Sequence, residues 1–306
     1  MNRHTLQTIL AAAAITAPLA GCGLSTEGEN RLARFQWEDP SAPLGADLDH
    51  AIAEGTIARL DIQALDATAG LRVRGAKIDP PEIARIVATE INTLEIEGLT
   101  SGEAKLTIQT DNGEDVTTLR VARAAEIRVN APLNHDKVLV GGIETLIIER
   151  RDITGQKLVG VAPADLEIKT PDAAEHVPGD DPAEFRLRYL SEGGKTIEIG
   201  DGQLSREIVG LDAIATFDFA ANLDNANIDA GASQPGVIQA LDAAGDMIGA
   251  LEGLLQIESE TPETCTATYT EQLYLPGLTI EGIAPGACVI KGTLGEHEGR
   301  LDILIK

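Results

Sequence analysis

The three cysteines of this 306-residue chain are the side chains most open to chemistry. A cysteine thiol can be oxidised to a disulfide, bind a metal or act as a nucleophile. Cys22 follows a short apolar run in the stretch APLAGCGLS, whereas Cys265 and Cys288 lie close together near the other end. The two locations call for separate explanations.

The segment before Cys22 has the three-part layout of an export signal. It begins with a positive charge at Arg3, continues with an alanine-rich apolar run over residues 6–19, and ends in two small residues. An apolar run of about 14 residues is too short for a helix to cross ~30 Å of hydrocarbon at 1.5 Å per residue. We therefore expect residues 1–21 to be a cleaved signal rather than a membrane span.

Leu19-Ala20-Gly21-Cys22 resembles the lipobox of bacterial lipoproteins. The resemblance implies cleavage before Cys22, lipid attachment to its thiol, and acylation of the new amino group. Several acyl chains hold a protein stably to a bilayer, whereas one holds it only marginally. In diderm members of the family an aspartate after the cysteine retains the protein at the inner membrane. Gly23 stands there, which implies the outer membrane and leaves its surface or periplasmic face open.

The alternative for this segment is an ordinary secretory signal cut near Ala20. It would leave Cys22 as an exposed free thiol, which is unusual in an oxidising compartment. We expect Cys22 to be the lipid-attachment residue.

Cys265 and Cys288 are 23 positions apart, and an even pair in one exported domain is most simply a disulfide. A thiol nucleophile and a zinc site are the alternatives. The sequence offers no Cys-x-x-Cys and no histidine pair to complete a zinc site. We predict a disulfide between the two.

Other catalytic or metal-binding patterns are weak. The histidines are scattered singly, and Gly-x-Ser-x-Gly, His-Glu-x-x-His and phosphate-binding glycine loops are absent. Oxygen ligands for calcium occur in DNGED at 111–115 and in LDNANID at 223–229, where Asp224 and Asp229 are the candidates, but neither matches an alternating-aspartate loop. Asn112-Gly113 instead predicts a hairpin turn. We expect no catalytic residues, no cofactor and no established metal site, although carboxylates distant in sequence could still form a hydrolase site.

Composition narrows the range of partners. The formal net charge is −25, from 24 Lys and Arg against 49 Asp and Glu. Nucleic-acid binding depends on cations that neutralise phosphates, so nucleic acid and anionic lipid headgroups are poor partners. Aromatic residues make up 3% of the chain, with Trp37 as the one tryptophan. This scarcity argues against a broad sugar-stacking platform and against an aromatic interface.

A repeat organises the rest of the chain. LEIEGLTSG at 94–102, FRLRYLSEG at 185–193 and LTIEGIAPG at 278–286 align without a gap. Apolar residues alternate in each stretch and a glycine closes it, which predicts a half-buried strand and a turn. The members of the apolar set are Leu94, Ile96, Leu99, Phe185, Leu187, Leu190, Leu278, Ile280 and Ile283.

A second landmark repeats with a similar period of about 90 residues. DITGQKLVGV begins at Asp152, DAAGDMIGAL begins at Asp242, and a looser version begins at Asp66. Several short strands and polar turns per repeat indicate tandem β-sandwiches. The two landmarks resemble bacterial Ig-like domains of the invasin-like surface proteins, in which an Asp-x-x-Gly turn links two early strands. The resemblance implies an all-β fold of three tandem Ig-like sandwich domains.

The expected organisation is a signal peptide at 1–21, a tether at 22–34, and Ig-like domains at 35–124, 125–214 and 215–306. Within the last domain, the segment from Gly236 to Glu258 also fits a helical apolar stripe. Its glycines oppose a helix by about 1 kcal/mol each, and its match to the repeat favours strands.

These observations predict a lipid-anchored, monomeric, non-catalytic rod in the cell envelope. Its expected role is surface display, adhesion or structural contact with an unidentified protein or glycan. The alternative is a periplasm-facing binding or accessory subunit of an envelope secretion or transport assembly.

Overall fold

The computed structural model describes residues 26–39, 42–65, 70–132, 135–161, 166–179, 184–219, 227–272 and 275–306. These residues form strands throughout, with one short 3-10 helix, η2 (Leu211–Ala213), before β18. None of the helical structure in these ranges is long and apolar enough to cross a membrane. Cys22 and the predicted signal lie outside the described residues.

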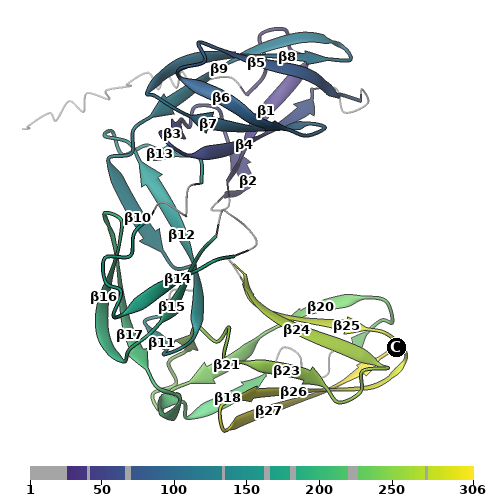
Figure 1. Cartoon of the computed structure of the whole chain (residues 1–306). Coiled ribbons are helices and arrows are strands. Elements are labelled where there is room, and N and C mark those ends of the chain that lie inside the picture. Colours follow the sequence, from purple (N-terminus) through teal and green to yellow (C-terminus); the bar gives the residue numbers. More distant parts are fainter. Residues whose placement is uncertain are drawn as a thin grey trace, which may run out of the picture.

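Sandwich 1 is built from β1 to β9 and has two facing sheets (Figure 1). One sheet has the order β2-β1-β4-β7-β6 and the other β3-β9-β8-β5. With β1, β4, β5, β6, β7, β8 and β9 taken as strands A to G, these sheets correspond to the A-B-E-D and C-F-G sheets of an immunoglobulin-like sandwich, and β3 is a short A′ strand. The strands are β1 (Ala33–Asp39), β2 (Ala42–Ala46), β3 (Ile52–Ala53), β4 (Ile57–Ala64), β5 (Val73–Asp79), β6 (Ala84–Thr89), β7 (Thr93–Gly98), β8 (Gly102–Thr110) and β9 (Gly113–Ala122).

Sandwich 2 repeats this plan with β10 to β17. Its first sheet has the order β10-β12-β15-β14, with β13 paired to β12, and its second sheet contains β16, β17 and β11. The A′ strand β11 pairs parallel with the last strand β17, as β3 does with β9. The strands are β10 (Glu126–Asn130), β11 (Lys137–Leu139), β12 (Ile143–Arg151), β13 (Lys157–Leu158), β14 (Ala174–Val177), β15 (Phe185–Tyr189), β16 (Gly193–Ile199) and β17 (Gly202–Val209).

Sandwich 3 is formed by β18 to β27. Its sheets have the orders β20-β25-β24 and β19-β27-β26-β23, and β18 pairs with β21. The segment from Gly236 to Glu258 consists of strands and turns, so the helical alternative is wrong for it. The strands are β18 (Thr216–Phe219), β19 (Asn227–Ile228), β20 (Ser233–Gly236), β21 (Ile238–Leu241), β22 (Ile248–Gly249), β23 (Gln256–Ser259), β24 (Cys265–Gln272), β25 (Leu275–Gly282), β26 (Gly286–Leu294) and β27 (His297–Ile305).

The sequence repeat maps onto one place in each sandwich. The first two apolar residues of each stretch are fully buried, because alternate side chains of a strand point to the same face. The third lies beyond the strand and is 37–50% exposed, contrary to the simple alternation. Its N–H donates to the turn before the D strand in every case, at 2.8 Å from Leu99 to Ile83, from Leu190 to Ala173 and from Ile283 to Thr264.

Among the described residues each sandwich has its own buried core, and no buried cluster contains residues of all three sandwiches. Trp37 belongs to the first core, is 1% exposed, and donates from Nε1 to the His50 carbonyl at 3.1 Å. The tryptophan is therefore a packing residue.

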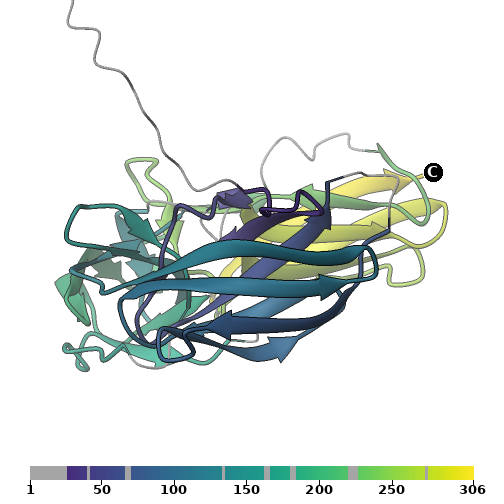
Figure 2. The ribbon, with the colours of Figure 1, turned by 90° about the horizontal axis from the view of Figure 1, so that it is seen from above.

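The three sandwiches follow an open C, whereas the sequence predicts a rod. In Figure 1 sandwich 1 lies above sandwich 2, and sandwich 3 turns back beneath it. Figure 2, seen from above, places sandwiches 1 and 3 over one another with sandwich 2 to one side. The bend is set at the two junctions, where a hairpin of each sandwich pairs with a strand of the sandwich before it.

Candidate functional site

The candidate site lies at the two junctions between sandwiches, where strands and charged side chains of neighbouring sandwiches meet. At each one the Asp-x-x-Gly hairpin of the following sandwich lies on the A′ strand of the preceding sandwich. Asp152 organises the first hairpin by accepting hydrogen bonds from the N–H groups of Thr154 (2.8 Å) and Gln156 (3.0 Å). The Thr154 hydroxyl is the main reason that the pKa of Asp152 lies below its usual range. The repeated turn is thus a structural element, as predicted.

At the first junction, the hairpin adds a strand to β3. Val159 donates to the Ala51 carbonyl and accepts from the Ala53 N–H, both at 2.9 Å. Its neighbour Leu158 is 4% exposed and clusters with the same two alanines. This junction joins the sandwiches by backbone pairing and apolar burial.

The second junction has the same strand pairing and, in addition, ion pairs between the sandwiches. Ile248 and Gly249 pair parallel with Lys137 and Val138 of β11. Ion pairs join Lys137 to Asp242 and Arg186 to Glu252 across the boundary. The close approach depends on Gly142, because a Cβ atom there would lie 1.8 Å from the Ala250 carbonyl oxygen.

A buried charged cluster lies directly behind the second junction. Arg206 donates to Glu144 from Nη2 at 3.0 Å and from Nε at 3.2 Å, and the Tyr189 hydroxyl donates to the same carboxylate. All three residues are buried. Burial, together with the Glu144 charge, raises the pKa of Tyr189 well above its usual value. The cluster is closed to solvent, and its hydrogen bonds join β12, β15 and β17.

His135 links this cluster to sandwich 3. A Cβ atom at Gly249 would lie 2.4 Å from Cδ2 of the His135 ring, so the ring packs on the incoming strand. Burial lowers the pKa of His135, against the opposing influence of the Glu144 charge.

Acidification is expected to weaken this region through His135. The unfolded imidazole protonates near pH 6.5, whereas the folded imidazole resists protonation to lower pH, so the unfolded state binds more protons. The His135 contribution is therefore complete above pH 6.5 and decreases as the pH falls below it. Chemical denaturation of the wild type and of His135→Gln between pH 7.5 and 5 measures it. The stability difference should shift against the wild type on acidification, and a constant difference would contradict the assignment.

The segment predicted to be a tether is bound to sandwich 1 from residue 27 onward. Asp115 is fully buried and accepts hydrogen bonds from the N–H groups of Asn30 (2.8 Å), Leu32 (2.9 Å) and Ala33 (2.9 Å). Glu29 also donates to the Val116 carbonyl at 2.8 Å. We call residues 27–33 the strap. The second half of the expected tether at 22–34 therefore lies against sandwich 1.

A cavity of about 310 Å³ lies between the strap and β9. Glu27, Glu29 and Arg31 line one side, and Val116, Thr117 and Thr118 line the other. Its ionisable lining groups are the carboxylates of Glu27 and Glu29 and the guanidinium of Arg31.

The calcium candidates do not come together. Asp115 is occupied by backbone N–H groups, and Asp224 lies outside the described residues. Asp229 is exposed after β19. Across the described ranges no group of three or more His, Cys, Asp or Glu side chains is placed to hold a metal ion. The 110–113 hairpin forms as predicted, but strand pairing closes at Thr110 and Gly113, so Asp111 and Asn112 are the turn residues.

Cys265 and Cys288 form the expected disulfide, with Cα atoms 5.7 Å apart. Both are fully buried in the core of sandwich 3. By the chain-entropy estimate, closing this loop contributes about 3 kcal/mol. The disulfide joins β24 of one sheet to β26 of the other, so its role is structural.

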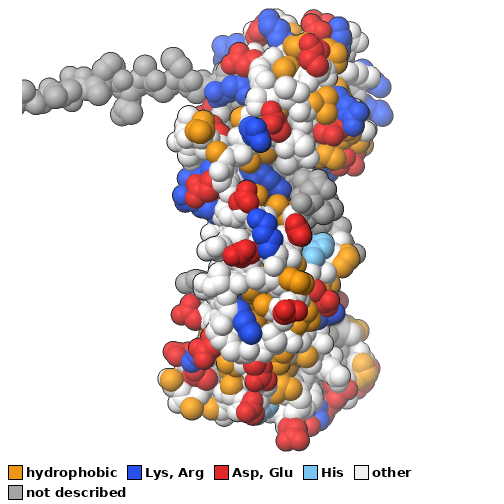
Figure 3. Space-filling view, turned by 60° about the vertical axis from the view of Figure 1, so that its left-hand side comes forward, with side chains coloured by type: hydrophobic (Ala, Val, Ile, Leu, Met, Phe, Trp, Pro, Cys, Tyr) orange, Lys and Arg blue, Asp and Glu red, His pale blue; other side chains and the backbone are white. Residues whose placement is uncertain are grey.

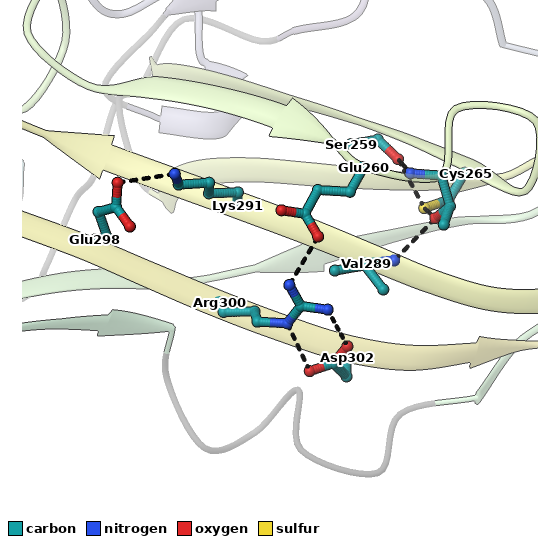
Figure 4. Close-up of polar contacts among 9 residues, drawn as sticks. Ser259, Glu260, Cys265, Val289, Lys291, Glu298, Arg300 and Asp302 are labelled. Carbon is teal, nitrogen blue, oxygen red and sulfur yellow. Dashed lines mark hydrogen bonds and ion pairs between the residues drawn. The ribbon is translucent and has the colours of Figure 1, made fainter.

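Sandwich 3 presents a strongly acidic surface. Residues 215–306 contain three Lys or Arg against 14 Asp or Glu. Two of the three cations are held locally: Arg300 by Glu260 at 2.7 Å and Asp302 at 3.2 Å, and Lys291 by Glu298 at 2.8 Å (Figure 4). Basic side chains are correspondingly frequent over the upper part of the molecule in Figure 3 and sparse at its lower end.

No protein-family model matches the chain, and no curated protein matches it in sequence. Solved structures with distant similarity include domains 4 and 5 of the S-layer protein SbsC, at 12% identity and a TM-score of 0.26, over 51% of this chain and 89% of that one. The Escherichia coli adhesin FdeC matches at 14% identity and a TM-score of 0.24, over 92% of this chain and 98% of that one. Invasin, described as a bacterial integrin-binding protein, matches at 14% identity and a TM-score of 0.24, over 91% of this chain and 60% of that one.

An endo-fucoidan hydrolase of glycoside hydrolase family 107 is found at the same TM-score of 0.24. Similar structures therefore include both surface proteins and an enzyme. At such TM-scores they do not decide between these classes, and the assignment of the fold depends on the sheets described above.

Proposed function

We propose that this protein is a lipid-anchored, non-catalytic component of the bacterial cell envelope that acts in structural contact, display or adhesion. The observation that carries the proposal is the position of Cys22 in Leu19-Ala20-Gly21-Cys22, five residues before the strap. Five residues span at most about 17 Å. A lipidated Cys22 would therefore hold sandwich 1 close to the membrane.

The remaining structure supports a mechanical and not a chemical role. The deeply buried carboxylates are held in place, Glu144 by Arg206 and Asp115 by backbone N–H groups of the strap. A hairpin of each following sandwich also pairs with the sandwich before it. Gly23 after the cysteine favours the outer membrane as the location, by the sorting rule of the lipoproteins that this segment resembles. An accessory subunit facing the periplasm is the second candidate, favoured by the C shape, which offers a concave side to a partner (Figure 1).

Replacing Cys22 with alanine is expected to move the protein from the membrane fraction to the soluble fraction. The thiol is the acceptor of the lipid, and without it the apolar run of the signal is too short to span the bilayer. Partition into detergent and incorporation of labelled palmitate measure the change. Gly23→Ala, which keeps the cysteine, is the matched control. A Cys22→Ala protein that stayed with the membrane would contradict lipid anchoring.

Protease treatment of intact cells separates display from the accessory role. A displayed protein should be cut in intact cells. A protein that faces the periplasm should be cut only after lysis, and that result would exclude surface adhesion.

A further inference from the structure

The A′ strands of sandwiches 1 and 2 each receive a hairpin from the following sandwich. β3 receives the hairpin around Val159, and β11 receives the hairpin around Gly249. The residues that pair stand at the same distance from the turn aspartate, seven positions after Asp152 and seven after Asp242. One mode of strand addition therefore occurs twice.

β19 is the corresponding strand of sandwich 3. Ile228 pairs with Ile305 as Ile52 pairs with Val121. The turn that follows is repeated bond for bond: Gly55 donates to Gly98, and Gly231 donates to Gly282, both at 2.8 Å. β19 is the outermost strand of its sheet. By this equivalence, the Asn227 carbonyl and the Asp229 N–H correspond to the groups of Ala51 and Ala53 that bind Val159.

These two backbone groups point away from β27 because the pairing of β19 with β27 uses the groups of Ile228. Lys306 donates to the Ile228 carbonyl at 2.9 Å. Among the described residues, neither the Asn227 carbonyl nor the Asp229 N–H has a hydrogen-bond partner of the kind found at the other two edges. An unpaired outer edge is a template for another strand.

The side chains beside this edge also differ from those at the filled junctions. Leu304, the register partner of Asn227, is 49% exposed, whereas Arg120 and Glu207 hold its position in sandwiches 1 and 2. The incoming residues at the two filled junctions, Leu158 and Ile248, are 4% and 1% exposed. An incoming apolar residue paired beside Asn227 would lie on the same face of the sheet as Leu304 and reduce its exposure.

We propose that β19 is a partner-binding edge that takes a β-hairpin from another protein, pairing parallel with Asn227–Asp229 and covering Leu304. The hairpin carries an Asp-x-x-Gly turn and an apolar strand, as do the two hairpins inside this chain. Its net charge is positive, because sandwich 3 has few cations and two of them are already paired. This inference goes beyond the proposed function and does not depend on lipidation of Cys22.

A hairpin of this chain provides the probe. A peptide of residues 147–161, closed by an added terminal disulfide, has a net charge of +1 from Arg150, Arg151 and Lys157 against Glu149 and Asp152. Its hairpin form is verified by NMR before it is titrated into the full mature chain. We expect saturable binding, and hydrogen exchange at the Asp229 amide slowed by about tenfold or more at saturation.

Two matched pairs test the geometry. Leu304→Glu should weaken binding by about tenfold, whereas Leu190→Glu, which alters a leucine of similar exposure on sandwich 2, should leave it unchanged. A Val159→Pro peptide lacks the N–H that donates to the A′ strand and should bind at least tenfold more weakly. Both protein variants alter exposed positions, and circular dichroism checks their folding.

The proposal is overturned if the proline peptide binds as well as the parent, if exchange at Asp229 does not change, or if both leucine variants weaken binding equally. Sedimentation of the chain alone tests a second copy as the occupant. Self-association that is abolished by Leu304→Glu would assign the edge to a second copy and contradict the heterologous partner.

Discussion

Glu144→Ala is expected to destabilise sandwich 2 by about 3–5 kcal/mol, which is the usual cost of removing one member of a buried ion pair. The substitution leaves the Arg206 guanidinium charged in a buried place and removes the acceptor of the Tyr189 hydroxyl. Since the cluster lies behind the second junction, the pairing of β11 with β22 should weaken as well. Hydrogen exchange measured separately in each sandwich detects both effects, and exchange in sandwich 1 should remain unchanged.

Two variants separate this effect from a general loss of charge. Glu175→Ala removes a carboxylate whose pairing with Arg188 is largely exposed, and such pairs contribute at most about 1 kcal/mol. The double variant Glu144→Leu/Arg206→Leu replaces the ion pair with apolar groups and should recover much of the loss. Equal destabilisation by Glu144→Ala and Glu175→Ala would show that the buried cluster does not stabilise the sandwich.

Asp115→Ala is expected to destabilise sandwich 1 by about 4 kcal/mol and to release the strap. Three N–H groups, from Asn30, Leu32 and Ala33, lose a charged acceptor, and an unsatisfied buried donor costs about 1–3 kcal/mol. Part of this cost is relieved because the released strap becomes solvated. Trp37 lies in the same core and reports unfolding of this sandwich by its fluorescence.

Asp111→Asn is the matched control for this prediction, because it alters an exposed aspartate of the same hairpin. It should change stability by less than about 1 kcal/mol. Amide exchange across residues 28–34 distinguishes release of the strap from global unfolding. An Asp115→Ala protein with full stability and a protected strap would show that the backbone bonds of β1 hold the strap without this carboxylate.

The sequence predicted the fold well because strand periodicity and turns are local properties. The alternation in LEIEG and its counterparts requires only that one face of a strand be buried. The Asp-x-x-Gly turns are also local, since the aspartate binds N–H groups within four residues. The pairing of Cys265 with Cys288 followed from the count of cysteines and the expected compartment.

The functional groups of the junctions were not predictable in this way. Glu144 lies in the apolar run IETLII and looks like an outward-facing residue of a strand, and its partners come from strands far along the chain. Lys137 and Asp242 are 105 positions apart, and only the docking of one sandwich on the next brings them together. The carboxylates of DNGED predict oxygen ligands for calcium, but Asp115 in this stretch accepts hydrogen bonds from the backbone of the strap.

The C shape was missed for a related reason. A repeat in sequence shows that the units are alike, and it carries no information on the angle between them. That angle depends on contacts such as Gly142 against the Ala250 carbonyl, where the absence of a side chain allows close approach.

The strand that completes each junction comes from the following sandwich, and this has a consequence for the order in which the chain folds. A chain that emerges with its amino terminus first presents β3 before Val159 is available to cover it, although β9 of the same sandwich already ends at Ala122. Sandwich 1 therefore passes through a stage at which it is folded but still has an adhesive edge. Misassembly is possible only until the next hairpin arrives, so the rate at which the chain emerges determines how long the edge stays exposed.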